Sequence, residues 1–205
     1  MDNETVLGEY NKRKEEIKKA LEGFKAIKNE KDLFHELCFT ILTPQSNGFR
    51  CWKIVEDLKK MKFFENGLEL KELQRFLQGR VRFHNRKRDY LNLVRENWKK
   101  IFENLKEGNN EKLREWLIKN IKGHGLKEGS HFLRNIGREN LAILDRHILR
   151  CLTNLNVIDE IPKSLSKKKY FEIENKFKEY SNKIGIKMDE LDLLFWGMAT
   201  GKVFK

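Results

Sequence analysis

The side chains of this sequence best suited to chemistry are a lysine and an aspartate that follow a glycine-rich turn. Lys127 follows Gly123-His124-Gly125 after one leucine, Leu126, and Asp145 lies eighteen residues further on, in Leu144-Asp145-Arg146-His147-Ile148-Leu149-Arg150. A neutral lysine amine is a nucleophile that forms Schiff bases. A carboxylate can stabilise developing positive charge or accept a proton. The simpler alternative is that Lys127 is one more surface lysine and that Asp145 only caps a helix.

The turn before Lys127 has the composition of a hairpin between two helices. Gly123 and Gly125 permit a tight turn with positive φ, and they expose the N–H groups at the start of the next helix. Such a helix N-terminus binds anions, and a DNA phosphate would suit it. These features are typical of a helix–hairpin–helix, although an ordinary glycine-rich turn would look the same.

The overall charge favours a polyanionic partner. The sequence of 205 residues has 43 Lys and Arg against 31 Asp and Glu, which gives a formal net charge of +12. Nucleic acid is therefore the first partner to test. Five basic residues lie between Arg80 and Arg88, with Phe83 and His84 among them, and this mixture of cations and aromatic rings fits DNA. Arg82 and Arg86 are the DNA-binding candidates in this segment.

Several protein classes are excluded by composition. No stretch approaches the roughly 18 apolar residues of a membrane span. The acidic start of the chain predicts no signal peptide. The 3 cysteines are widely spaced and form no CxxC pair, which excludes zinc ribbons and four-thiolate iron–sulfur clusters. We therefore expect an intracellular protein of the cytoplasm or nucleoid, with no metal and no cofactor.

Apolar residues recur every three or four positions along most of the chain, as in amphipathic helices. No segment alternates as a half-buried strand does. The sequence thus predicts an all-α fold of about ten helices, with helical patterns over 10–27, 31–42, 51–58, 90–105, 111–121, 127–136, 145–155, 170–184 and 189–198.

Four segments in this order resemble the endonuclease III superfamily of DNA glycosylases. The hairpin with Lys127 is one, and the segment of Asp145 resembles the pattern VDTHIFR of the superfamily. In addition, residues 41–46 (ILTPQS) resemble its LSAQAT-type turn, and residues 83–87 (FHNRK) resemble its LYNSK-type segment. The resemblance covers residues 33–152. It implies that Lys127 is the nucleophile and that Asp145 assists it.

The end of the chain indicates a branch of this superfamily. Residues 195–205 (FWGMATGKVFK) resemble the short type 2 8-oxoguanine DNA glycosylase/lyase family, which ends in a lysine. The resemblance implies an enzyme that flips 8-oxoguanine out of duplex DNA, excises it through a lysine Schiff base and cleaves the strand by β-elimination. We expect a monomer, because a cleft that clamps DNA needs no second copy. Two alternatives stay open: a glycosylase for another oxidised or mismatched base, and a helix–hairpin–helix module that binds DNA without catalysis.

A pocket for the base is predicted near the end of the chain. Asp192 and Trp196 are four residues apart and share a helix face. An ionised Asp192 can accept hydrogen bonds from N1–H and the 2-amino group of 8-oxoguanine, and Trp196 can stack on the extruded base. The resemblance implies that Phe83 stacks on the other face and that the carboxylate of Lys205 reaches the pocket. It also implies that Gln45 enters the duplex or contacts the partner base.

The resemblance further implies two helical lobes with the active site in the cleft between them. Residues 36–139 would form a six-helix lobe that contains the helix–hairpin–helix, and residues 1–35 with 140–205 would form the second lobe.

Overall fold

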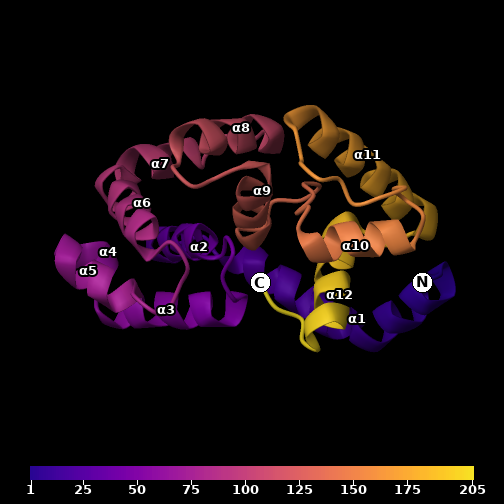
Figure 1. Ribbon diagram of the computed structural model, residues 1–205, viewed down its shortest axis with the longest axis horizontal. Helices are drawn as coiled ribbons and strands as arrows, with labels where there is room; N and C mark the ends of the chain where they lie inside the picture. Colours follow the sequence, from indigo (N-terminus) through magenta and orange to yellow (C-terminus); the bar gives the residue numbers. More distant parts are fainter. The chain divides into compact units, whose positions relative to one another are not determined.

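The computed structural model describes residues 1–205, and its regular structure is entirely helical (Figure 1). The prediction of an all-α fold is confirmed. The twelve helices are α1 (Asn3–Ala26), α2 (Glu30–Leu42), α3 (Gly48–Lys60), α4 (Phe63–Asn66), α5 (Leu70–Leu77), α6 (His84–Glu96), α7 (Trp98–Asn104), α8 (Asn110–Asn120), α9 (Leu126–Asn135), α10 (Arg146–Asn154), α11 (Lys167–Ile184) and α12 (Met188–Thr200). None of them is both long and apolar enough to cross a membrane.

The helix count differs from the prediction in one region. Helices α4 and α5 have only 4 and 8 residues, too few for a periodic pattern to repeat. The single helix expected over 90–105 is divided into α6 and α7 at Asn97, whose φ of −100° and ψ of 10° interrupt the helical conformation. Helix α6 also begins earlier than expected, because its first turn is polar and carries no apolar periodicity.

The chain divides into two compact units. Unit 1 comprises Met1–Ala26 and Leu133–Lys205, and unit 2 comprises Ile27–Phe132. The lobes predicted from the sequence change at 35/36 and 139/140, whereas the units change at 26/27 and 132/133. The second change therefore falls inside α9, whose last turn belongs to unit 1.

Unit 2 is built around α2, which is buried over 10 of its 13 residues. Helices α3, α4 and α6 all pack against it. Phe34 of α2 meets Trp98 edge to face at 5.2 Å, and the Trp98 indole N–H donates to Glu30 Oε1 at 2.9 Å. Because α2 is buried on nearly every side, the residues at its C-terminal end have a fixed support.

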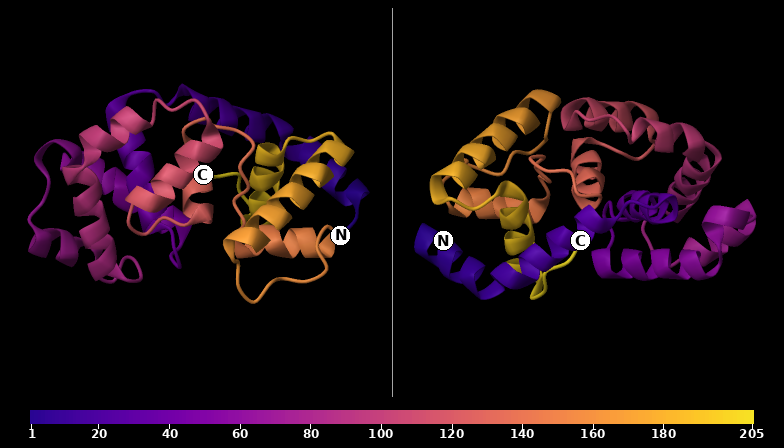
Figure 2. Two further views of the ribbon diagram at one scale, coloured as in Figure 1. Left: turned by 90° about the horizontal axis from the view of Figure 1, so that it is seen from above. Right: turned by 180° about the vertical axis from the view of Figure 1, so that it is seen from behind.

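Unit 1 is built around α12, which contacts α1, α10 and α11. Figure 2 shows these four helices from two further directions. The apolar core of unit 1 includes Phe177 of α11 and Phe195 of α12, whose rings stack with centroids 6.2 Å apart and planes 22° apart. Helix α12 also buries two carboxylate residues, Asp189 and Asp192, among its apolar side chains.

Candidate functional site

The hairpin between α8 and α9 depends on one glycine. Gly123 has a φ of +85°, and a Cβ atom there would lie 2.6 Å from the ring of Tyr90. Both the backbone conformation and the space therefore require glycine. The expected positive φ is wrong for Gly125, which does not adopt it. Instead Gly125 precedes the first residue of α9, and its N–H donates to Glu128 Oε2 at 3.3 Å.

Lys127 is the second residue of α9 and lies beside this cap. Its side chain is 25% exposed, and its Nζ is 3.4 Å from Glu128 Oε1. Glu128 therefore contacts both the helix cap and the predicted nucleophile. Sequence reasoning missed Glu128, although a glutamate at the third position of a helix is the signal of a capping box.

His124 fixes the hairpin to the core of unit 2. The side chain is 8% exposed, and its Nε2 is 3.1 Å from Thr40 Oγ1 of α2. Burial, with a further contribution from the positive charge of Lys127, lowers the pKa of His124 to about 3. The imidazole is thus neutral near pH 7, and it serves as a hydrogen-bonded packing residue of the hairpin.

A second lysine, Lys87, is buried in unit 2 under the turn that follows α2. It is 3% exposed. Its Nζ donates to Leu42 O at 2.7 Å, Pro44 O at 2.8 Å and Ser46 Oγ at 2.9 Å. Burial lowers the pKa of Lys87 to about 8, and the charge of Lys127 also contributes to this shift. Lys87 is one of the five basic residues between Arg80 and Arg88 that the sequence suggested for DNA, and for this residue the expectation is wrong, because its ammonium is buried.

Gln45 and Phe83 share an unusual backbone conformation. Their φ angles are +53° and +56°, in the left-handed region that side chains other than glycine rarely adopt. Phe83 is 50% exposed and precedes α6, so it is not a core residue. The Arg82 guanidinium lies 5.8 Å from the Phe83 ring centroid, and the Arg82 N–H donates to Ser46 Oγ at 3.2 Å. Arg86, on the first turns of α6, is exposed.

Asp145 caps α10, as the sequence predicts. Its Oδ1 accepts hydrogen bonds from His147 N at 2.8 Å and Ile148 N at 2.9 Å, while its Oδ2 accepts none. The buried segment 141–144 leads to it. This segment is held by α11, where Tyr170 Oη donates to Ala142 O at 2.6 Å and Glu174 Oε2 accepts from Ala142 N at 2.8 Å. The position of Asp145 is therefore set by packing as well as by the helix.

Asp192 and Trp196 lie on α12, four residues apart as expected. Asp192 is 7% exposed, so it is not a solvated surface residue. The rings of Trp196 and His147 meet edge to face, with their centroids 5.4 Å apart. The buried Nε1 of Trp196 has no hydrogen-bond partner. His147 is thus a packed residue, and its partner is the tryptophan proposed for stacking.

Two residues that the sequence did not indicate complete this part of unit 1. Arg134, at the end of α9, is 3% exposed, and its Nη1 is 3.4 Å from Asp192 Oδ2. The same guanidinium lies 5.0 Å from the ring centroid of Phe24 in α1, and the Lys205 Nζ lies 5.8 Å from that ring. Phe24 therefore contacts the partner of Asp192 and the last residue of the sequence. No local pattern could reveal this cluster, because Phe24 is 110 residues from Arg134 and Arg134 is 58 residues from Asp192.

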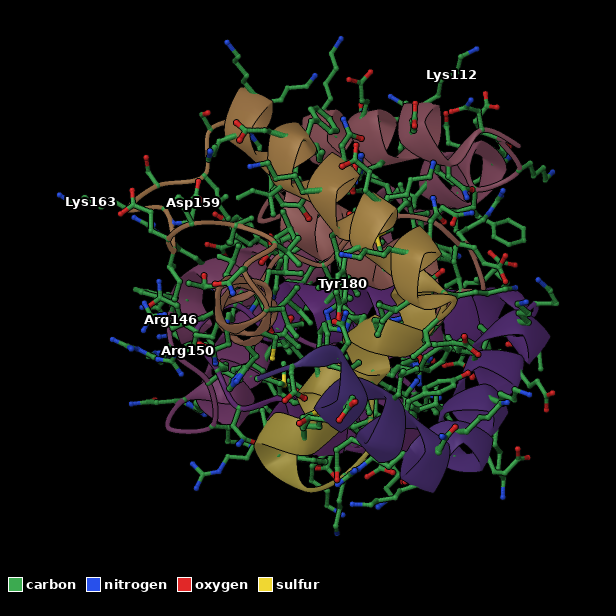
Figure 3. The ribbon with its side chains drawn as sticks, turned by 90° about the vertical axis from the view of Figure 1, so that its right-hand side faces the viewer. Lys112, Arg146, Arg150, Asp159, Lys163 and Tyr180 are labelled. Atoms are coloured by element: carbon green, nitrogen blue, oxygen red, sulfur yellow. The ribbon has the colours of Figure 1, made fainter.

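The predicted site residues are distributed over both units. Those of unit 2 are Gln45, Arg82, Phe83, Arg86, Gly123, Gly125 and Lys127, and those of unit 1 are Asp145, Asp192, Trp196 and Lys205. Figure 3 shows two further cations of unit 1, Arg146 and Arg150, which point outward from successive turns of α10. Both are exposed and can meet phosphates.

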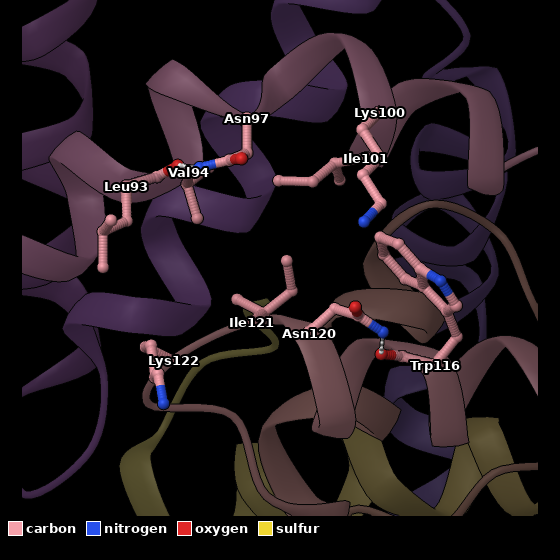
Figure 4. A pocket seen from close by; sticks show the side chains of 9 residues that line it. All are labelled: Leu93, Val94, Asn97, Lys100, Ile101, Trp116, Asn120, Ile121 and Lys122. Carbon is pink, nitrogen blue, oxygen red and sulfur yellow. Dashed lines mark hydrogen bonds between the residues drawn. The ribbon is translucent and has the colours of Figure 1, made fainter.

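Two hollows lie elsewhere on unit 2. One, of about 180 Å³, is lined by residues of α6, α7 and α8 and by the start of the hairpin, including Trp116, Asn120 and Lys122 (Figure 4). The other, of about 230 Å³, is lined by Arg50, Lys53, Ile54, Gly79 and Arg80. Neither lining includes a predicted catalytic or base-pocket residue.

Comparison with known proteins gives one consistent result. The sequence profile described as 8-oxoguanine DNA glycosylase matches residues 17–186. A protein of Fusobacterium nucleatum named 8-oxoguanine DNA glycosylase/AP lyase is 46% identical over 96% of this chain and 94% of its own. The crystal structure of the Methanocaldococcus jannaschii 8-oxoguanine glycosylase/lyase with a 15mer DNA containing 8-oxoguanine has a TM-score of 0.89 and 39% identity, and covers 99% of both chains. The 8-oxoguanine DNA glycosylase of Thermotoga maritima has the same TM-score at 33% identity, covering 99% of this chain and 98% of that one.

Proposed function

Because the chain belongs to the 8-oxoguanine DNA glycosylase family, we infer that it removes 8-oxoguanine from duplex DNA and then cleaves the strand as an AP lyase. The observation that carries this inference is the likeness over 99% of the chain to a glycosylase/lyase crystallised with DNA that contains 8-oxoguanine. The relatives named 8-oxoguanine DNA glycosylase/AP lyase support both activities. The net charge of +12 agrees with a polyanionic substrate.

Lys127 is the proposed nucleophile. Its neutral amine attacks C1′ of the flipped nucleotide as the bond from C1′ to the base breaks, and the base leaves with a proton. The sugar ring then opens to a Schiff base on Nζ, loss of a proton from C2′ follows, and the 3′ phosphate departs by β-elimination. Its position supports this role, because Lys127 lies in the first turn of α9, just after the hairpin, and keeps a quarter of its side chain exposed.

Asp145 is proposed to stabilise the positive charge that develops on the sugar and to accept a proton from the attacking amine. Its hydrogen-bonding pattern supports the role. Oδ1 is occupied by two backbone N–H groups of α10, which fix the carboxylate, and Oδ2 is left for the reaction. The N-cap and the catalytic role are thus compatible, since each uses a different oxygen.

The base pocket is proposed to contain Phe83, Asp192, Trp196 and Lys205. Asp192 would accept from N1–H and the 2-amino group of the base, and the ion pair with Arg134 supports an ionised carboxylate. Trp196 and Phe83 would stack on the base, and the exposed ring of Phe83 supports its part. Lys205 is included because it contacts the ring that also contacts Arg134.

DNA itself is proposed to be held by Gln45, Arg82, Arg86 and the hairpin of Gly123 and Gly125. The exposed turn of Gln45 would fill the space left by the flipped base, and the arginines would contact phosphates. We propose that the enzyme acts as a monomer in the compartment that holds the genome. Elution at twice the monomer mass would contradict the monomer.

Borohydride trapping tests the mechanism. A Schiff base between the protein and a duplex with one 8-oxoguanine opposite cytosine is reduced to a stable crosslink. We expect a crosslink with the native chain and with Lys119→Gln, an exposed lysine of α8 that serves as the matched control, and none with Lys127→Gln. A crosslink only with an abasic or oxidised-pyrimidine duplex would keep the mechanism and reject the substrate. Tight binding without any crosslink would instead indicate a DNA-binding module without catalysis.

A further inference from the structure

The buried ammonium of Lys87 joins the two loops of unit 2 that carry Gln45 and Phe83. On one side its three donors reach Leu42 O, Pro44 O and Ser46 Oγ, at 2.7, 2.8 and 2.9 Å. Leu42 ends α2, and Pro44 and Ser46 flank Gln45. On the other side Lys87 belongs to the first turn of α6, and its backbone N–H donates to Phe83 O at 3.0 Å. One residue is thus bonded to the neighbours of Gln45 and to Phe83 itself.

A second contact closes the link between the loops. The Ser46 hydroxyl accepts from Lys87 Nζ and also from the backbone N–H of Arg82, which precedes Phe83. Ser46 therefore bridges the turn after α2 and the segment before α6. A lysine ammonium has three N–H donors, and all three are used here by acceptors of that one turn.

The conformations of the two loops show why such a link is needed. Gln45 and Phe83 both have positive φ, a backbone conformation that is energetically unfavourable for residues other than glycine. Strained conformations of this kind persist only where the surrounding structure determines them. Lys87 is 3% exposed, and burial of an ammonium is itself costly unless all its donors are satisfied. Two local strains and one buried cation therefore depend on the same set of hydrogen bonds.

We propose that Lys87 is a positioning residue, which holds the turn of Gln45 and the loop of Phe83 in the arrangement that extracts a paired base from the duplex. The proposal rests on the DNA-facing roles proposed above for Gln45 and Phe83. Lys87 does not contact the reacting atoms in this role. It affects the step that separates the lesion from its partner base, and excision of a base that is already unpaired should depend on Lys87 much less.

Single-turnover excision from two duplexes tests this role in the full-length chain. In one duplex 8-oxoguanine lies opposite cytosine; in the other it lies opposite a tetrahydrofuran abasic analogue, so that no base pair must be broken. We expect Lys87→Met to lower the rate on the paired lesion roughly 10- to 100-fold, as a misplaced positioning element does, and to lower it far less on the unpaired lesion. Lys60→Met, on the exposed face of α3, should leave both rates unchanged.

Two further variants keep the test decisive. Ser46→Ala removes the bridging hydroxyl from a surface turn and should lower the ratio of paired to unpaired rates in the same direction, even if Lys87→Met folds poorly. Equal losses on both duplexes in these variants, or no loss, would overturn the positioning role. Gln45→Ala tests the turn separately from Lys87. If this variant leaves the ratio of paired to unpaired rates unchanged, the proposed role of the Gln45 turn in extracting the base is wrong. A lowered ratio in Gln45→Ala with an unchanged ratio in Lys87→Met and Ser46→Ala would overturn the role of Lys87 alone.

Discussion

Replacement of Arg134 by methionine should destabilise unit 1, because it removes a cation that pairs with the buried carboxylate of Asp192. The two side chains are 3% and 7% exposed, and Nη1 and Oδ2 are 3.4 Å apart. Removal of one partner from a buried ion pair costs about 3 to 5 kcal/mol, because the remaining charge stays desolvated. Loss of the contact between the guanidinium and the Phe24 ring adds to this cost.

The ion pair can be separated from simple loss of packing by a double-mutant cycle. For a chain of this size each kcal/mol lowers Tm by about 2 to 4 °C, so Arg134→Met should lower Tm by roughly 6 to 20 °C. In Arg134→Met/Asp192→Asn the uncompensated charge is gone, and we expect the double variant to be clearly more stable than the sum of the single effects predicts. Thermal unfolding followed by circular dichroism measures all four proteins. Additive single effects would refute the reasoning, since they would show that the two side chains do not interact.

Three further predictions follow from the site. Asp192→Asn should lower excision of 8-oxoguanine roughly 10- to 100-fold, the value of one good bidentate contact, while cleavage of a preformed abasic site by Lys127 stays unchanged; equal losses in both assays would contradict a role in base recognition. Gly123→Ala should lower the free energy of unfolding, measured with denaturant, by at least about 1 kcal/mol, because φ at this position is +85° and the new Cβ would meet the Tyr90 ring. An unchanged free energy of unfolding would show that the hairpin can rearrange. His124 has a pKa of about 3 in the folded chain against about 6.5 in the unfolded chain, so between these pH values only the unfolded chain binds the proton. The free energy of unfolding therefore falls as pH falls, by up to about 1.4 kcal/mol per pH unit. His124→Gln should show a flatter decline of stability across that window, and identical slopes would mean that His124 does not titrate on unfolding.

The sequence predicted best what local patterns encode. Apolar periodicity gave the helical fold, and residue type with position gave the N-cap at Asp145 and the required glycine at Gly123. It predicted least where neighbours distant in sequence decide the outcome. Helix α6 begins before its apolar pattern does, and the residue before it adopts a positive φ that the surrounding structure must hold.

The buried cations show the limit of an argument from composition. A net charge of +12 suggests a basic surface, yet Lys87, Arg114 and Arg134 are only 3%, 1% and 3% exposed. Each bonds or pairs with a group inside its own unit: carbonyl oxygens at the turn after α2, the Ser130 hydroxyl at 3.0 Å, and the carboxylate of Asp192. The net charge counts these buried residues in the same way as the exposed arginines. Only burial distinguishes the cations that can contact phosphate from those that hold the loops and the proposed pocket in place. Neutralising an exposed cation that contacts phosphate should therefore change the salt dependence of DNA binding, whereas neutralising a buried one should change stability or the extraction of the base and leave the salt dependence as it is.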